Sequence, residues 1–156
     1  MKISSYIVEE QIQIGVLHKR KRDIFKELLL NLTDLGKIDQ SEQGTILDLL
    51  IEREKLGSTA IGHGIAIPHA RVDNISEPLL VICVSREGVD FDSLDGELVF
   101  IIFLIISPKG EAGLHLKMLA TISRLLRDRF LAANIREAST PAQVKAMLCE
   151  QEKRLK

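Results

Sequence analysis

The sequence of 156 residues contains no tryptophan, and aromatic residues make up only 4% of it. The core of this chain therefore has to be built from Ile, Leu and Val, which dominate its 46% of hydrophobic residues. Its two cysteines lie far apart and neither belongs to a CxxC pair. Cys83 lies in an apolar run, where a reduced thiol behaves as a small hydrophobic side chain.

The chain has no excess of charge of one sign, because 21 basic residues face 22 acidic ones and the net charge is −1. This balance argues against a nucleic-acid-binding protein, which needs a basic face to neutralise phosphates. A local basic cluster runs from His18 to Arg22, just ahead of a predicted helix. We interpret it as a solvated helix start.

Long apolar runs are also missing. The longest, Leu98 to Ile106, has nine residues, whereas a membrane-spanning helix needs about 20. We therefore predict a buried strand there and no insertion into a membrane. The amino-terminal stretch MKISSYIVEEQIQ lacks the charged-then-apolar pattern of a signal peptide, so we expect a cytoplasmic protein.

The periodicity of the apolar residues predicts one α/β domain over residues 1–156. Helices are expected at about 20–35, 41–55 and 114–127 and after 139–141, and strands at 12–16, 79–85 and 98–106. The last two strands are almost continuously apolar, which is typical of strands covered on both faces. Helices on both sides of a strand-rich middle indicate an α/β sandwich.

The segment GSTAIGHGIAIPHAR, residues 57–71, combines two histidines with three glycines and a proline. So many glycines do not suit a buried strand, and they allow a ligand or partner to approach the backbone closely. His69 follows Pro68, which restricts the local backbone. His69 is therefore either a reactive group or a histidine bonded to the backbone of a tight turn.

Two further residues raise a similar choice. His115 is expected in the first turn of the helix at 114–127, where free backbone N–H groups favour an anion; the alternative is a histidine that is part of the core. Arg53 lies at the end of the helix at 41–55. It is either solvated or supplies a planar guanidinium that neutralises a phosphoryl group.

Arg53-Glu54 followed by LGSTAIGHGIAIPHAR resembles the phosphorylation-site signature of the IIA proteins of the phosphoenolpyruvate-dependent sugar phosphotransferase system (PTS). The resemblance is to the fructose/mannitol/nitrogen-regulatory class (type 2). It extends to VDFDSLDGELVFIIFLIISP and HLKMLATISRLLRD and covers about residues 5–150. It implies an α/β sandwich built on a mixed sheet, with His69 as the phosphorylated residue, His115 as the second active-site histidine and Arg53 lining the phosphoryl site. His63 stands where Asn or another polar residue is usual, and we do not expect it to be catalytic.

The resemblance also implies a function. A neutral imidazole, with an ordinary pKa of about 6.5, is nucleophilic, and its phosphoramidate passes the group onward. We expect a phosphohistidine carrier, and so a phosphotransferase component, that accepts phosphate on His69 from an HPr-like donor protein without cofactor or metal. It would pass its signal to a regulatory protein or its phosphate to a IIB protein.

Three alternatives remain open. The chain has no fused transport, IIB or HPr-like domain, which favours a nitrogen-type regulator over a IIA component of fructose or mannitol uptake. A second alternative is an interaction protein that has kept the fold and lost phosphotransfer. A metal site of His63, His69 and His115, perhaps with Cys83, is the third, although its spacing matches no common zinc motif. In the regulatory hypothesis, phosphate at His69 alters a docking surface around Ile61, Ile65 and Ile67.

Overall fold

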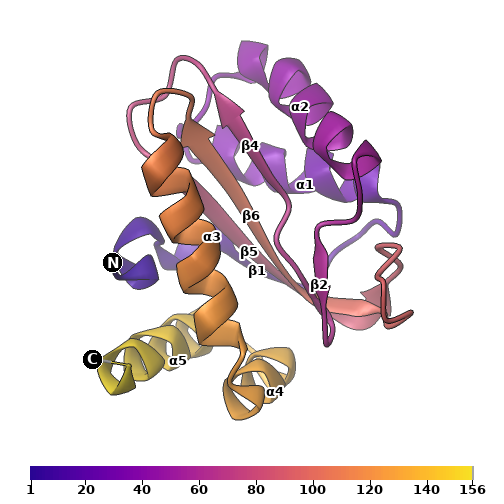
Figure 1. Cartoon of the computed structure of the whole chain (residues 1–156), viewed down its shortest axis with the longest axis vertical. Helices are drawn as coiled ribbons and strands as arrows, with labels where there is room; N and C mark the ends of the chain where they lie inside the picture. The colour runs from indigo at the N-terminus through magenta and orange to yellow at the C-terminus, as the bar shows by residue number, and fades with distance from the viewer. Residues whose placement is uncertain (156) are drawn as a thin grey trace.

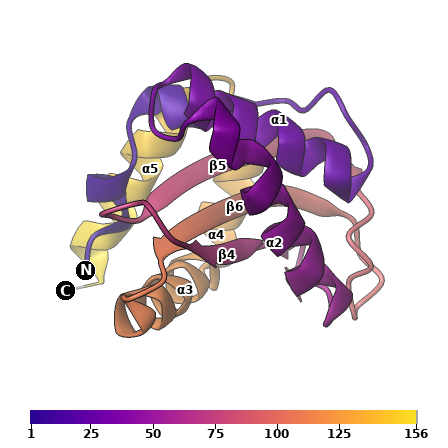
Figure 2. The same cartoon turned by 90° about the horizontal axis from the view of Figure 1, so that it is seen from above.

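A mixed β-sheet between two layers of helices forms the centre of the protein in a computed structural model, which describes residues 1–155 (Figures 1 and 2). Within those residues the strands are β1 (Ile12–Ile14), β2 (Ala60–Gly62), β3 (Ile65–Ala66), β4 (His69–Val72), β5 (Leu79–Val89) and β6 (Val99–Pro108). The helices are α1 (Lys21–Asp34), α2 (Gln43–Lys55), α3 (Ala112–Leu126), α4 (Arg129–Glu137) and α5 (Pro141–Arg154), with short 3-10 turns at Ile3–Tyr6, Glu9–Gln11 and Gln40–Glu42. Lys156, the last residue of the predicted domain, lies outside the described part.

The antiparallel pair β5 and β6 is the centre of the sheet. β1 runs parallel to β5 on one side. On the other side, β3 and β4 follow each other along β6, both parallel to it, and β2 pairs antiparallel with β3. The predicted α/β sandwich with a mixed sheet is therefore confirmed.

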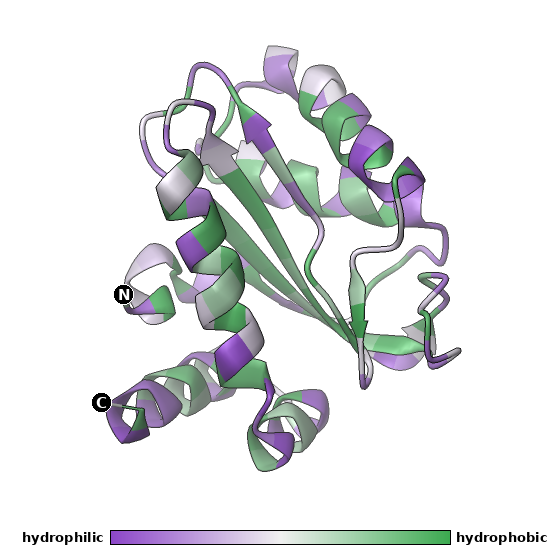
Figure 3. Ribbon diagram, in the orientation of Figure 1, coloured by the Kyte–Doolittle hydropathy of each residue, from purple (hydrophilic) through white to green (hydrophobic). Residues whose placement is uncertain are grey.

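The two faces of the sheet bury different cores. Ile102, Leu104 and Ile106 of β6 face the core beneath α1 and α2. Phe103 and Ile105 alternate with them and face the core beneath α3, α4 and α5. Both faces of the central strands are thus apolar, which explains why the run of apolar residues is continuous. Figure 3 accordingly shows these strands coloured as hydrophobic over most of their length.

The helices predicted at 20–35, 41–55 and 114–127 correspond to α1, α2 and α3. The last helix begins as predicted, with the Thr140 side chain accepting a hydrogen bond from the backbone N–H of Gln143. The short helix α4 was not predicted, although Asp128 caps it in the same way by accepting bonds from the N–H groups of Phe130 and Leu131. None of the helices within residues 1–155 is both long and apolar enough to cross a membrane.

The glycine-rich segment corrects one expectation, because much of it is strand. Pairing of β3 with β6 places Ile65 between the helical layers, at 1% exposure, and Ile67 is 3% exposed. Ile61, in β2, is 48% exposed. The prediction of a docking surface around these three isoleucines is therefore wrong, because two of them are buried. Gly64 occupies the turn between β2 and β3 at φ +81°, against the ring of Phe100.

Candidate functional site

A groove of about 630 Å³ lies where the end of α2, the start of β4 and the first turn of α3 meet. It is lined by Leu49, Glu52, Arg53, Leu56, His69, Ala70, Arg71, Lys109, Ala112, His115, Leu116 and Leu119. The fold thus brings together Arg53, His69 and His115, which three separate parts of the sequence supply. The elements that supply these residues can be followed in Figure 1, where β4 runs between α2 and α3.

His69 is the first residue of β4 and is partly buried. Its Nδ1 lies 2.8 Å from the carbonyl oxygen of Ile67. Because a carbonyl only accepts hydrogen bonds, Nδ1 carries the hydrogen and the lone pair of the neutral ring is on Nε2. Burial lowers the pKa of His69; the bond to Ile67 opposes this shift and the charge of Arg53 adds to it. The ring is therefore neutral and nucleophilic near neutral pH.

His115 lies in the first turn of α3 and is 6% exposed. Its Nδ1 is 2.8 Å from the hydroxyl oxygen of Ser107, at the end of β6. Burial, with the charges of His69 and Arg71, lowers the pKa of His115 to about 4. His115 is thus both a buried histidine with a hydrogen-bond partner and a neighbour of His69 in the groove, so the two predicted alternatives are not exclusive.

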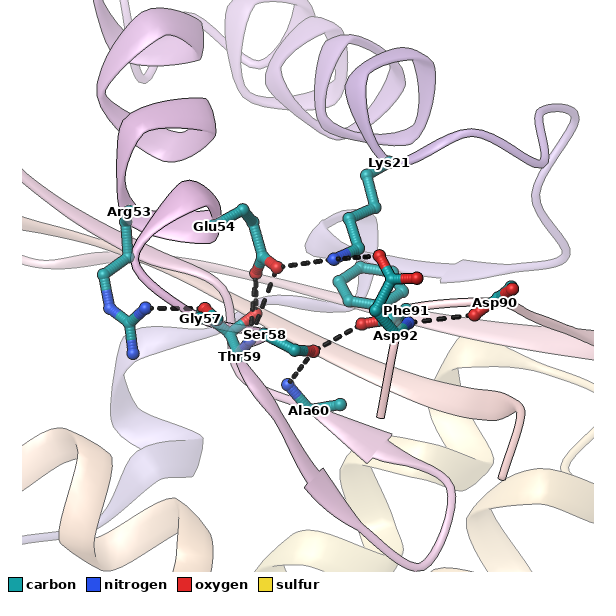
Figure 4. A network of polar contacts seen from close by, with 10 residues as sticks. All are labelled: Lys21, Arg53, Glu54, Gly57, Ser58, Thr59, Ala60, Asp90, Phe91 and Asp92. Atoms are coloured by element: carbon teal, nitrogen blue, oxygen red, sulfur yellow. Dashed lines mark hydrogen bonds and ion pairs between the residues drawn. The ribbon is translucent and has the colours of Figure 1, made fainter. Parts of the chain in front are cut away.

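Arg53 is partly buried at the carboxyl end of α2, and its Nη1 donates a 2.8 Å hydrogen bond to the carbonyl oxygen of Gly57 (Figure 4). Two further cations, Arg71 and Lys109, line the same groove, as does the carboxylate of Glu52. Three cationic side chains against one acidic one make the groove suitable for an anion such as a phosphoryl group.

The residues that support these groups were not predicted from the sequence. Ser107 is the first polar residue after the apolar run of β6, and that position was the signal available for it. Arg71 and Lys109 carried no signal of their own beyond charge. The groove also has an apolar rim that includes Leu56 and Leu116, which are 85% and 65% exposed.

Of the four residues of the hypothetical metal site, only His69 and His115 come together in the groove. His63 lies in the turn between β2 and β3 at φ +57°, where its backbone N–H bonds to the Asp95 carboxylate at 2.9 Å, and it is not among the residues that line the groove. Cys83 is buried within β5, which raises the pKa of its thiol to about 12. Over residues 1–155, no three His, Cys, Asp or Glu side chains are close enough to share a metal ion.

Known proteins resemble this chain over most of its length. Residues 5–151 match the family described as "Phosphoenolpyruvate-dependent sugar phosphotransferase system, EIIA 2". A nitrogen regulatory protein of Bradyrhizobium diazoefficiens is 36% identical over 143 residues, which are 92% of this chain and 91% of that protein. A PTS fructose-specific EIIA component of Haloferax volcanii is also 36% identical, over 125 residues and 80% of each chain.

Among solved structures, the crystal structure of the nitrogen regulatory protein IIA-Ntr from Neisseria meningitidis superimposes with a TM-score of 0.84. The two chains are 28% identical, and the match covers 94% of this chain and 98% of that one. The resemblance inferred from the sequence is therefore confirmed at the level of the family. The chain belongs to the EIIA 2 family of the phosphoenolpyruvate-dependent sugar phosphotransferase system.

Proposed function

We propose that this protein is a phosphoryl carrier, and so a phosphotransferase component, in which Nε2 of His69 is phosphorylated by an HPr-like donor protein. One observation carries the proposal. The hydrogen bond from Nδ1 to the Ile67 carbonyl leaves Nε2 as the nucleophilic nitrogen, in a groove lined by cationic side chains.

The transfer step needs no cofactor and no net proton movement at His69. The Nε2 lone pair attacks the phosphorus of the donor's phosphohistidine while the donor's P–N bond breaks. The electron pair of that bond returns to the donor imidazole, so one P–N bond forms as another is lost. Such a transition state spreads charge over three equatorial oxygens, and its stabilisation depends on positioning and electrostatics.

His115 and Arg53 would supply that stabilisation. When the Ser107 hydroxyl donates to Nδ1 of His115, the hydrogen of the neutral ring is on Nε2, which becomes a donor for a phosphoryl oxygen. Arg53 offers a second donor and a positive charge, and its bond to Gly57 holds the guanidinium at the edge of the groove.

The apolar rim of the groove would be the docking surface for the donor. Leu56, at the end of α2, and Leu116, on α3, are large, exposed apolar side chains that line the same groove as His69. A partner that covers them also excludes water from the reacting atoms. This surface replaces the isoleucine surface that we expected from the sequence.

We further propose that phosphorylation switches the binding of a regulatory partner, in the manner of a nitrogen-type regulator. The nitrogen regulatory proteins among the relatives support this, and the 0.84 TM-score is to a structure of that type. A doubly charged phosphoryl group beside Leu56 and Leu116 would make their burial by a partner costly. The second candidate, a IIA component of sugar uptake, is supported by the fructose-specific relative, which has the same percentage identity over a shorter stretch.

The carrier proposal is tested by incubating the protein with phosphoenolpyruvate, enzyme I and HPr and measuring its intact mass. We expect one acid-labile phosphate on the wild type and on His63→Ala, and none on His69→Ala, with unchanged circular dichroism for all three. A phosphate that persists on folded His69→Ala would overturn the assignment. A folded wild-type protein that takes no phosphate would instead support the interaction protein that has kept the fold and lost phosphotransfer.

Regulation and uptake are separated by two assays on the same protein. Pull-downs with the phosphorylated and unphosphorylated protein, with His69→Ala as control, should recover different partners. The same partners in both states, together with rapid transfer of the phosphate to a sugar-specific IIB protein, would instead establish the uptake role.

A further inference from the structure

Glu54, next to Arg53 in α2, has a buried carboxylate that does not line the groove. Its side chain is 6% exposed. It accepts hydrogen bonds from the backbone N–H of Thr59, at 3.2 Å, and from the Thr59 hydroxyl (Figure 4). Lys21 donates to it from α1 at 2.8 Å. A buried carboxylate is costly unless it is paired and hydrogen-bonded, and here it is both.

Thr59 connects this carboxylate to His69 through two more hydrogen bonds. The carbonyl oxygen of Thr59 accepts from the backbone N–H of Ile67 at 3.0 Å. The carbonyl oxygen of Ile67 in turn accepts from Nδ1 of His69 at 2.8 Å. The bond that selects the nucleophilic nitrogen is therefore the last in a series that begins at Glu54.

The same turn is held from two other sides. Arg53 donates to the carbonyl oxygen of Gly57, so consecutive side chains of α2 bind both ends of the segment 57–59. The hydroxyl of Ser58 donates to the carbonyl oxygen of Phe91. As Figure 4 shows, the Glu54 carboxylate lies between this turn and the ammonium group of Lys21.

Lys21 supplies the positive charge that offsets the Glu54 carboxylate. It also pairs with Asp92 at 3.2 Å, and its ammonium lies 5.2 Å from the centre of the Phe91 ring. Burial by itself would lower the pKa of Lys21, but the bonds and charges of Glu54 and Asp92 outweigh it and raise that pKa. The positive charge that offsets Glu54 is therefore present throughout the neutral range.

We infer that Glu54 is a positioning residue for phosphoryl transfer, acting through Thr59 and Ile67 on the orientation and tautomer of His69. This inference rests on the proposed function and names a further residue of the same site. Glu54 does not line the groove, and its hydrogen bonds reach His69 through the backbone of residues 59 and 67. Its charge also acts on the ring directly and raises the pKa of His69, against the effect of burial. A shift of this backbone would misplace Nε2 relative to the donor phosphorus, which costs much of the rate of an in-line transfer.

The experiment measures two quantities on Glu54→Ala and Thr59→Val: the tautomer of His69, by NMR of its imidazole nitrogens without phosphate, and the rate of phosphorylation by HPr. For Glu54→Ala we expect a mixture of tautomers in place of the Nδ1–H form, and a rate lower by on the order of 100-fold. Thr59→Val, which keeps the backbone donor, should show a smaller change in both. Thr59→Ser, which restores the hydroxyl, should recover wild-type behaviour.

The matched control is Glu27→Gln. Glu27 is also a mostly buried carboxylate, with an 11% exposed side chain, and it binds His18, Gln13 and the backbone of Leu17 away from the groove. We expect this variant to lose stability while its His69 tautomer and transfer rate stay at wild-type values. This control distinguishes a general loss of stability from a specific effect on the position of the His69 ring.

An unchanged His69 tautomer and rate in folded Glu54→Ala would overturn the inference. If that variant does not fold, Thr59→Val decides, and wild-type values for it would overturn the inference equally. Failure of the proposed function looks different: a wild-type protein in the Nδ1–H tautomer that takes no phosphate from HPr contradicts the carrier proposal. The tautomer measurements on the variants would remain valid in that case.

Discussion

The imidazole rings of His69 and His115 lie 5.1 Å apart between their centroids, with their planes inclined by 59°. Each ring has its Nδ1 engaged by a neighbour, the Ile67 carbonyl for His69 and the Ser107 hydroxyl for His115. Two rings this close do not readily carry two positive charges, and the charge of His69 is one cause of the lowered pKa of His115. Because a phosphoryl group is negatively charged, its presence between the two rings would favour protonation of His115.

Replacing His115 with alanine should slow phosphorylation of His69 without removing the acceptor. Loss of one preorganised donor to a developing anion typically costs about 100- to 1,000-fold in rate. Quenched-flow mixing with phosphorylated HPr measures this, and His18→Ala, an exposed histidine outside the groove, is the control. Equal rates for His115→Ala and the wild type would show that His115 does not stabilise the transferred group.

Arg53→Ala should slow the same transfer, and Arg53→Lys should recover only part of the rate. Lysine restores the positive charge, but it lacks the planar fork that can bond to Gly57 and to a phosphoryl oxygen together. The measurement is the single-turnover rate at saturating donor. Full recovery by lysine would mean that charge alone matters at this position.

The stability of the protein should fall as the pH is lowered from about 6.5 to about 4. In that window the unfolded chain binds a proton at His115 that the folded protein excludes, so the folded state binds fewer protons. The free energy of unfolding then decreases by at most about 1.4 kcal/mol per pH unit from this residue, and the lowered pKa of His69 acts in the same direction. Above about pH 7.5 the slope from both residues vanishes, because the unfolded chain no longer binds these protons.

Urea unfolding at a series of pH values tests this, with His115→Gln compared against the wild type. Carboxylates contribute equally to both proteins, so the difference between the two curves isolates His115. Parallel curves between pH 6.5 and 4 would contradict the expected burial of a neutral imidazole.

Charged substitutions on the rim of the groove should separate docking from chemistry. Leu56→Asp and Leu116→Asp are expected to reduce phosphorylation by HPr by about tenfold or more, because a carboxylate would be buried under the donor. Phosphorylation by phosphoramidate, a small donor that needs no protein interface, should be little changed. Leu17→Asp, at an exposed leucine outside the groove, is the matched control. A parallel loss with both donors would place these leucines in the chemistry and not in docking.

Several features of the protein followed from the sequence alone. The continuous apolar run of β6 predicted a strand covered on both faces, and helical periodicity predicted α1, α2 and α3 within a few residues. The motif ending in Pro68-His69, by its resemblance to a known family, pointed to the groove residues Arg53, His69 and His115 together. These signals are local, since they depend on residue order and on short-range spacing.

The tertiary structure decided what depends on partners that are distant in the sequence. Parallel pairing with β6 turned the glycine-rich segment into strands and buried Ile65, so the exposed apolar surface beside His69 comes from Leu56 and Leu116 instead. Packing of α3 against β6 sets Ser107, at the end of that strand, against His115. Glu54 likewise meets Lys21 and Thr59 only after α1 and α2 have packed on the sheet. Hydrogen bonds and burial depend on distances between residues in the folded protein, and these distances cannot be read from the order of residues along the chain.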